Sequence, residues 1–508
     1  MLFMLLTFIL ACICAVIFRY SLWRNECSKR MPGRKPGLFD ILGDAKDFIV
    51  FYAPSGSNMF QKKGYDVLRK RTEEFGRKKL FCLWITYRPL VMIVKSEAVK
   101  QLMEKKIHNK YFIYEWLQPL LGTGLLTSEV SKWKTRRKLL MPCFNLTVLR
   151  GFLSLFNEHS QKLVEILQER TKEEFTYIET PITLATMDII CETMFGVKIN
   201  ALRNDNPPFV RSVQRLLEIL LARIYKIWYW PNWTFYLSKD GKEMKHHVKI
   251  VHDFTRKIIQ ERKERYLSGH TEKDRGKRKA LLDRLLEMHM ETGELREEGI
   301  REEVNTFALA GHETVTVTII WALYLIGLHK DVQEKIHEEL DRVFEDDTKR
   351  PVTDKDLNDL QYLDCVLKET LRLYPSAPWF GRHIPEDTNI CGHTLPEGST
   401  CVILPYFLHR DEEVFPDPER FDPERFSSTN IHKIPEYAYI PFSAGSRNCI
   451  GKTFANMELK VIISSLLRNF SIESLDTRDK VQMLASITLC PFHPIRFRIR
   501  HRTIRKQH

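Results

Sequence analysis

The chain has few of the features that divide a protein into small cross-linked or repeated units. Its 508 residues include 11 cysteines, and none of them forms a Cys-x-x-Cys pair. This spacing argues against a disulfide framework and against a structural zinc site, and it favours a reducing compartment. Residues 45–500 contain no internal repeat and no linker rich in proline, glycine or serine. These absences favour one large domain, although the length alone would allow more.

Two kinds of binding motif are also missing. Gly122-Thr-Gly124 lacks the third glycine of a dinucleotide fingerprint, and no clear strand leads into it. We therefore expect that NADPH does not bind this chain. No nucleic-acid-binding motif is present either, so the formal net charge of +13 points to an anionic membrane surface or an acidic protein partner. A role of this charge in solubility alone stays open.

The apolar N-terminal run lacks a basic residue before it. Thr7 is the only polar side chain up to Phe18, and the basic residues follow as Arg19, Arg24, Lys29 and Arg30. A cleaved signal peptide carries its positive charge first, whereas charge on the downstream side keeps the rest of the chain in the cytosol. We therefore predict an uncleaved membrane anchor with its basic flank over residues 1–24, with a cleaved signal as the alternative.

Two Pro-Gly pairs follow this anchor, at Pro32-Gly33 and Pro36-Gly37. Such pairs interrupt regular structure and predict a semi-rigid hinge over residues 25–45. The remaining residues, 46–508, then form the main domain.

The ten residues from Phe442 to Gly451 carry the clearest chemical pattern. Cys449 lies between Gly445, which permits a tight turn, and Gly451, which lets the backbone approach a flat ligand closely. Apolar residues at helical spacing predict a helix over 452–470, and its N-terminal N–H groups favour a thiolate at Cys449. Such a thiolate can be the axial ligand of a heme iron. A buried structural thiol is the plain alternative.

A long helix is predicted over residues 297–329. Its second half is apolar nearly all round, which indicates burial, and the central carboxylate of Glu313 disfavours a membrane span. Burying a polar group costs free energy, so the carboxylate of Glu313 beside the hydroxyl of Thr314 in these apolar surroundings indicates a specific role. A hydroxyl can take part in a hydrogen-bonded chain that transfers protons, and a carboxylate can supply protons to that chain. In the alternative, Thr314 donates to its own helix and Glu313 reaches a nearby arginine.

Two further residue pairs share a helix face. Trp133 and Arg137 are spaced i, i+4, so that the guanidinium and the indole N–H can both meet one carboxylate. Glu369 and Arg372 are spaced i, i+3. In the simpler interpretation the first is a surface aromatic–arginine pair and the second an exposed ion pair of little energetic value.

The chain turns aromatic and basic between residues 207 and 237. Aromatic side chains such as Trp228 and Trp233 lie close to Arg223 and Lys226. This mixture suits a membrane interface, and it suits a plain core segment equally well.

Together these patterns resemble the cytochrome P450 superfamily over nearly the whole chain, about residues 30–508. The heme-binding loop of that superfamily is matched at five positions: Phe442, Gly445, Arg447, Cys449 and Gly451. The resemblance implies a mainly α fold with small β-sheets, and a heme b held between the long helix and the Cys449 loop. It also implies that Phe442 shields the sulfur, and that the heme propionates meet Trp133, Arg137, Arg382 and Arg447.

The resemblance gives other residues a structural or catalytic part. Glu369, Arg372 and Arg425 would form a buried triad that is structural rather than catalytic. We prefer Arg425 to Arg420, which stands in a similar Pro-Glu-Arg-Phe sequence, because Arg425 lies 24 residues before Cys449. The catalytic residues would be Glu313 and Thr314. The turn at 491–494 would line the substrate pocket.

The activity implied is monooxygenation, in which one atom of O2 enters an organic substrate and the other leaves as water. Electrons would come from NADPH–cytochrome P450 reductase, with cytochrome b5 as an additional candidate. The implied location is the endoplasmic reticulum membrane, with a single N-terminal anchor and a cytosolic catalytic domain. We expect no nucleic-acid partner.

Within the superfamily, Lys132–Leu140 and Glu303–Phe307 resemble the fourth family. Fatty-acid or lipid hydroxylation is therefore expected, and oxidation of foreign compounds or hormones is the alternative. An oxygen-independent heme-thiolate isomerase or dehydratase and a non-catalytic heme binder are rivals. In fatty-acid hydroxylases of the fourth family a glutamate that can form an ester with a heme methyl stands where this chain has Ala310. We therefore expect no covalent heme link at this position.

Overall fold

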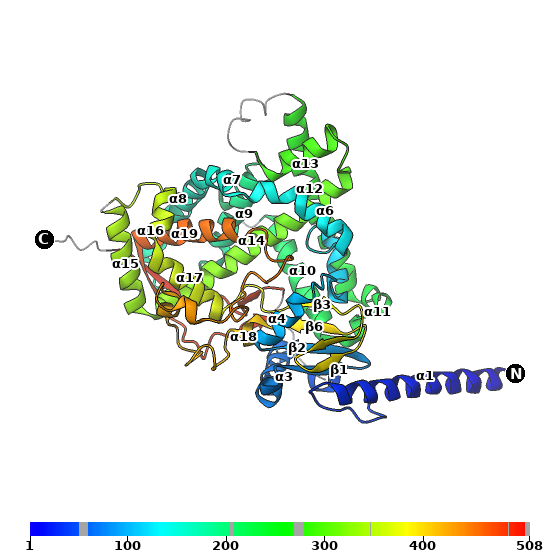
Figure 1. The fold of residues 1–508 in the computed structure, drawn as a ribbon. Helices are drawn as coiled ribbons and strands as arrows, with labels where there is room; N and C mark the ends of the chain where they lie inside the picture. The colour runs from blue at the N-terminus through cyan, green and yellow to red at the C-terminus, as the bar shows by residue number, and fades with distance from the viewer. Residues whose placement is uncertain (50–58, 204–206, 269–278, 346, 486, 503–508) are drawn as a thin grey trace.

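The fold is mainly helical with small sheets, as the sequence predicts (Figure 1). A computed structural model describes residues 1–49, 59–203, 207–268, 279–345, 347–485 and 487–502. The α-helices are α1 (Leu2–Arg30), α2 (Ala45–Phe48), α3 (Met59–Phe75), α4 (Ser96–Glu104), α5 (Gln118–Leu121), α6 (Val130–Leu140), α7 (Leu146–Gly151), α8 (Leu153–Glu169), α9 (Glu179–Met194), α10 (Pro208–Tyr225), α11 (Asn232–Leu237), α12 (Lys239–Leu267), α13 (Leu281–Met290), α14 (Glu297–Leu328), α15 (Lys330–Phe344), α16 (Asp354–Asp359), α17 (Gln361–Leu373), α18 (Pro405–Leu408) and α19 (Lys452–Asn469).

Ten short strands form the sheets in the described residues. They are β1 (Leu80–Ile85), β2 (Arg88–Ile93), β3 (Phe380–His383), β4 (Thr388–Ile390), β5 (His393–Leu395), β6 (Thr400–Ile403), β7 (Phe470–Ser474), β8 (Met483–Ala485), β9 (Leu489–Pro491) and β10 (Phe497–His501). Four of them form one sheet in the order β1-β2-β6-β3, in which β2 and β6 run parallel. The other strands pair in antiparallel twos. Short 3₁₀ helices connect these elements, among them η2 (Phe112–Leu117) before the cavity described below.

The long helix α14 runs through the centre of the helical body (Figure 1). Every side chain from Val315 to Ile326 is at most 3% exposed, so this half of the helix is a protein core and not a membrane span. Trp321 fixes it in place, because its ring stacks on Tyr374 at a centroid distance of 3.9 Å and its indole N–H donates to Leu489 O. Gly311 lets α9 approach, since a Cβ there would lie 2.3 Å from Ile190 Cδ1.

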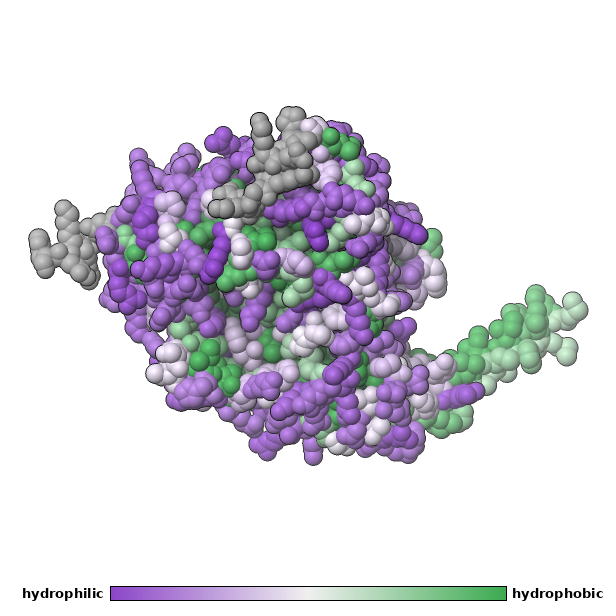
Figure 2. All heavy atoms as spheres, turned by 45° about the horizontal axis from the view of Figure 1, so that its top comes forward, coloured by the Kyte–Doolittle hydropathy of each residue, from purple (hydrophilic) through white to green (hydrophobic). Residues whose placement is uncertain are grey.

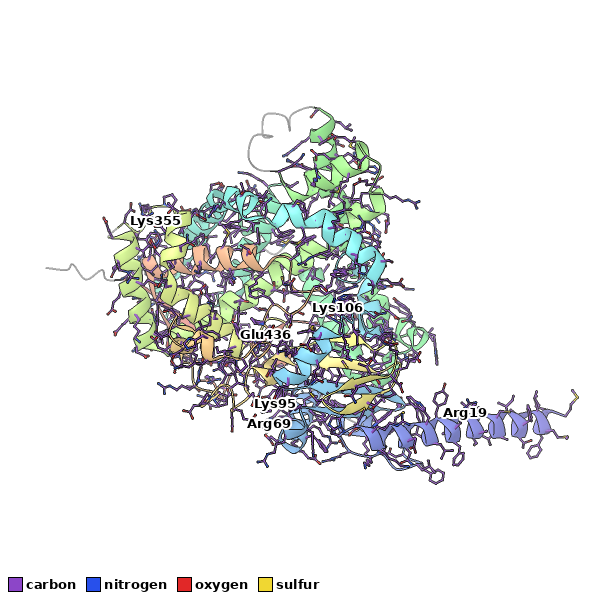
Figure 3. The ribbon with its side chains drawn as sticks, viewed as in Figure 1. Arg19, Arg69, Lys95, Lys106, Lys355 and Glu436 are labelled. Atoms are coloured by element: carbon purple, nitrogen blue, oxygen red, sulfur yellow. The ribbon has the colours of Figure 1, made fainter. Side chains whose placement is uncertain are left out.

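The N-terminal helix α1 projects from the body, and its projecting part is apolar (Figures 1 and 2). The most hydrophobic window of this helix has a mean hydropathy of 2.6 and is 0% buried. Arg19 lies on this projecting part (Figure 3). The structure is therefore consistent with a membrane anchor at the N-terminus.

The predicted boundary between anchor and hinge, at residue 24, falls inside α1. Arg24 is only 1% exposed and donates to Thr86 O, Gly37 O and Asp40 O at 2.9, 3.1 and 2.5 Å. After the helix ends at Arg30, Cys82 N–H donates to Pro32 O at 2.7 Å. The stretch predicted as a hinge therefore lies hydrogen-bonded against the β1–β2 hairpin.

A buried ion pair ties α17 to the loops that follow β6. Glu369 and Arg372 are both 0% exposed, and Arg372 Nε and Nη2 donate to the Glu369 carboxylate at 2.7 and 2.8 Å. Arg425 Nε lies 3.5 Å from Glu369 Oε1. Arg420 contributes its carbonyl oxygen instead, which accepts from Arg372 Nη2 at 3.0 Å. One carboxylate thus organises two arginines that lie far apart in the sequence.

Removing this carboxylate should destabilise the fold strongly. We expect Glu369→Gln to lower the free energy of unfolding by about 3–5 kcal/mol, because Arg372 would keep a buried charge without its partner. Denaturant unfolding followed by circular dichroism measures the change. The control is Glu473→Gln, whose carboxylate is 42% exposed and pairs with Arg498 at 2.6 Å; an exposed pair should cost less than about 1 kcal/mol. Equal effects of the two substitutions would contradict this account.

Candidate functional site

A cavity lies between the middle of α14 and the loop around Cys449. Further walls come from η2, α6, α9, α10, β3 and the turn between β8 and β9. Most lining side chains are aliphatic or aromatic, among them Trp116, Leu125, Leu220, Phe307 and Phe380. The polar ones are fewer: some belong to the Cys449 loop, Glu313 and Thr314 lie on α14, and Lys110, Arg382 and Thr488 come from other walls. This arrangement suits an apolar ligand presented to a few fixed polar groups.

The loop before α19 presents the Cys449 side chain to the cavity. Cys449 N–H donates to Phe442 O at 2.9 Å, which closes the loop, and Gly445 has a φ of +70° that side-chain-bearing residues rarely adopt. Gly451 precedes the first residue of α19, and a Cβ there would lie 3.9 Å from Cys449 Sγ. Phe442 lines the same cavity as the sulfur.

The surroundings of Cys449 act on the pKa of its thiol in opposite directions. Burial raises the pKa of this thiol, while the Gly451 backbone N–H, Arg137 and Lys452 oppose the rise. The backbone N–H, as predicted, and the two cations favour the thiolate, whereas burial favours the neutral thiol and has the larger effect on the pKa. A bound metal ion would reverse the balance, because a coordinating thiol is deprotonated.

Cationic side chains meet at one end of the cavity. Arg447 is 8% exposed, and its Nη2 donates to Ser128 O at 2.9 Å. Its Nε and Nη1 have no hydrogen-bond partner among the residues that the structure describes. Arg382 is 2% exposed and donates to Gly381 O. Burial and the neighbouring Arg382 lower the pKa of Arg447 to about 10. Burial and both arginines hold the pKa of Lys110 far below its usual value.

These cations fit the cofactor that the resemblance implies. Within the described parts of the chain, no carboxylate pairs with Lys110, Arg382 or Arg447, so buried positive charge faces the cavity uncompensated. The two propionates of a heme would supply the missing anions while Cys449 faced the iron. The Trp133 ring lies against Arg447, with the guanidinium carbon 4.6 Å from the ring centroid.

Arg137 is hydrogen-bonded to the loop that carries Cys449. Its Nη1 and Nη2 donate to the backbone oxygen and to Oδ1 of Asn448, both at 2.9 Å. It also lines the cavity. In the structure Arg137 therefore binds α6 to the Cys449 loop.

On the opposite wall, one turn of α14 carries Ala310, Glu313 and Thr314, all of which line the cavity. Thr314 Oγ1 donates to Ala310 O at 2.9 Å, which is the within-helix hydrogen bond named above as the simpler alternative. The other half of that alternative is not found, because Glu313 forms no ion pair among the described residues. Its Oε1 accepts from Thr488 Oγ1 at 3.2 Å instead.

Two lining residues carry no signal in the sequence, and one predicted contact with the pocket lies elsewhere. Lys110 was missed because a single lysine in a loop carries no motif. Thr488 and its neighbour Ile487 line the cavity, whereas the described lining contains none of residues 491–494. The prediction that this later turn lines the pocket is wrong: the turn that reaches the cavity and contacts α14 comes earlier, before β9 begins at Leu489.

Comparison with known proteins identifies the family. The sequence pattern of the cytochrome P450 family matches residues 49–497. A rat protein named cytochrome P450 4V2 is 42% identical over 466 residues, which cover 89% of this chain and 87% of the rat chain. The human protein of that name is 40% identical over 459 residues, covering 88% and 86%. Cytochrome P450 4c3 of Drosophila melanogaster is 38% identical over 432 residues, covering 82% and 81%. This chain therefore belongs to the cytochrome P450 family and, within it, to the fourth family.

Proposed function

We propose that this P450 monooxygenase hydroxylates fatty acids or related lipids. The single observation that carries the proposal is the cavity, whose lining is mostly aliphatic and aromatic and offers few polar groups beside Cys449 and the turn with Glu313 and Thr314. An apolar wall offers a lipid chain no hydrogen bonds, so position in the cavity rather than polar recognition would select the carbon that reacts.

Cys449 is the proposed axial ligand, and Trp133, Arg137, Arg382 and Arg447 are the proposed partners of the heme propionates. When bound, a heme-thiolate supplies the chemistry of O2 activation. The chain's own residues orient that group, exclude water from the apolar part of the cavity and neutralise the propionates.

Thr314 and Glu313 are the proposed proton-delivery residues. The Thr314 hydroxyl hydrogen donates to Ala310 O, so its oxygen can accept a further hydrogen bond from the cavity side. Glu313 is held by Thr488 and can pass a proton toward that side. Both positions lie on a helix that is fixed by its buried second half, which keeps the two groups in place.

The location and partners belong to the same proposal. Helix α1 would anchor the enzyme in the endoplasmic reticulum membrane with the catalytic domain in the cytosol. Trp228 and Trp233 are 47% and 70% exposed, as residues at a membrane interface would be. Phe235, which lies in α11 with Trp233, is fully buried. Electrons would come from NADPH–cytochrome P450 reductase, with cytochrome b5 as an additional candidate.

The function is tested by turnover under labelled dioxygen. Full-length enzyme with purified reductase and NADPH is incubated with ¹⁸O2 and a panel of fatty acids, other lipids and xenobiotics. We expect lipid products that carry one ¹⁸O atom, identified by mass spectrometry. Labelled products from xenobiotics alone would support the alternative substrate class. Products without ¹⁸O would indicate an isomerase or dehydratase, and the absence of any product and of NADPH-dependent oxygen uptake would indicate a non-catalytic heme binder.

The axial ligand is tested by Cys449→Ala. We expect this variant to lose the absorption spectrum of thiolate-ligated, CO-bound ferrous heme, because no other cysteine among the described residues lines the cavity. The spectrum is recorded on the reduced protein with and without CO, and Cys490→Ala serves as the matched control. Retention of the thiolate spectrum in Cys449→Ala would refute the assignment.

The absence of a carboxylate at position 310 leads to a prediction about heme attachment. Alanine has no nucleophilic group, so acid–organic extraction should remove all heme from the wild-type protein. Ala310 lines the cavity, so Ala310→Glu should place a carboxylate there and retain part of the heme after turnover. Ala310→Gln is the control, because it has a similar size and no carboxylate. Heme that stays with the wild-type polypeptide during extraction would show that another residue forms a link.

A further inference from the structure

Two consecutive glutamates of α14, outside the turn that carries Glu313, hold the loop between α5 and α6. Glu302 is 6% exposed. Its Oε1 accepts from Thr123 N–H at 2.9 Å and from Thr123 Oγ1 at 2.7 Å. Its Oε2 accepts from Lys132 Nζ of α6 at 2.6 Å, and the same ammonium donates to Thr123 Oγ1 at 2.6 Å. Loop, α6 and α14 therefore meet in one closed set of hydrogen bonds.

Glu303 binds the same loop two residues further on. Its side chain is fully buried, and its Oε2 accepts from Leu125 N–H at 3.1 Å. Its Oε1 lies 3.7 Å from Arg136 Nε of α6 and has no hydrogen-bond partner in the described part of the chain. Burial raises the pKa of Glu303 to about 7, against the effects of the Leu125 amide and Arg136. Although burial also acts on Glu302, Lys132 and Thr123 hold the pKa of that carboxyl below its usual value.

The loop between these contacts forms part of the cavity wall. Leu125, whose amide Glu303 binds, and the next residue, Leu126, both line the cavity. The backbone is fitted closely to α14, because a Cβ at Gly122, whose φ is +63°, would lie 2.6 Å from Glu302 Cγ. At its far end the loop accepts the hydrogen bond from Arg447 to Ser128 O.

Helix α6 divides its basic side chains between two tasks. Lys132 and Arg136, spaced i, i+4, face the two glutamates, whereas Trp133 and Arg137 line the cavity beside the cysteine loop. Successive helix positions differ by about 100° around the axis, so side chains of one turn can contact α14 on one side and the cavity on the other. The contacts that hold the wall and those expected to hold the cofactor therefore share one rigid element.

We propose that Glu302 and Glu303 are positioning residues that set the place of the Leu125–Leu126 wall against the substrate, and so determine which carbon is oxidised. This inference rests on the proposed monooxygenase function. The Leu125 and Leu126 side chains make only apolar contacts, which do not fix the position of the loop backbone. The two carboxylates do fix it, because they accept hydrogen bonds from the loop amides of Thr123 and Leu125. Neither carboxylate is among the residues that line the cavity, so they act through the loop.

The test uses full-length enzyme with bound heme and three variants. Glu302→Gln removes the charge that Lys132 neutralises, and Glu302→Gln with Lys132→Met removes both charges, so that no unpaired buried charge destabilises the fold. Glu297→Gln is the matched control: it is the same substitution on the same helix, at a carboxylate that is 66% exposed and 3.9 Å from Lys263 Nζ. Each variant must first show the wild-type CO-bound spectrum.

The first measurement is hydrogen exchange of peptides that cover residues 122–126. We expect exchange at least about fivefold faster in both Glu302 variants and unchanged in the control, because hydrogen bonds to a charged group are lost. This measurement does not depend on turnover. Unchanged exchange in the double variant would show that other contacts hold the loop and would overturn the inference.

The second measurement is the distribution of hydroxylated positions on one fatty acid, together with kcat and KM. We expect the ratio of products to change at least about threefold and KM to rise more than kcat falls in both Glu302 variants. A product ratio and KM equal to those of the wild type, despite faster loop exchange, would overturn the positioning role. If the wild type forms no oxygenated product, the proposed function fails instead, and the exchange measurement still decides whether the glutamates hold the loop.

Discussion

Uncompensated positive charge at one end of the cavity is the constraint on which the site depends. Lys110, Arg382 and Arg447 lie together there, and the described residues offer them no carboxylate. Burying an unpaired charge costs free energy and favours the neutral form, and for this reason the pKa values of Lys110 and Arg447 are lowered. An anionic cofactor would remove it. The protein chain should therefore reach its full stability only with that group bound, so that cofactor binding and folding are linked.

The rest of the fold holds this end of the cavity and the cysteine at a fixed separation. Helix α14 is buried along its second half, so the turn with Glu313 and Thr314 cannot shift without moving the core. On the other side, the Glu369–Arg372 pair fixes the loops that lead to the cysteine loop through Arg420 and Arg425. The site is thus positioned by one buried helix and one buried ion pair, and it is not built on flexible surface loops.

Local patterns were predictable from the sequence, whereas most long-range contacts were not. Periodicity predicted α14 and α19 to within one residue at their ends, because a continuous apolar stripe leaves few alternatives. The preference for Arg425 over Arg420 rested on spacing from Cys449, and the side chain of Arg425 is the one near Glu369. In contrast, Lys110 and Thr488 come to the cavity through tertiary packing, which no spacing in the sequence records. The contact between residues 31–45 and the β1–β2 hairpin was hidden for the same reason.

Helical geometry explains why residues close together on α6 and α14 can contact different parts of the structure. On α14, Glu302 and Glu303 bind the loop, and three turns later Glu313 and Thr314 reach the cavity. On α6, Lys132 and Arg136 contact the glutamates while Trp133 and Arg137 border the cavity. Because each helix is rigid over these turns, a change in the place of the loop is transmitted to the side chains beside the cofactor end. Selection of substrate position and retention of the cofactor are therefore expected to be coupled through α6 and through the hydrogen bond from Arg447 to Ser128 O.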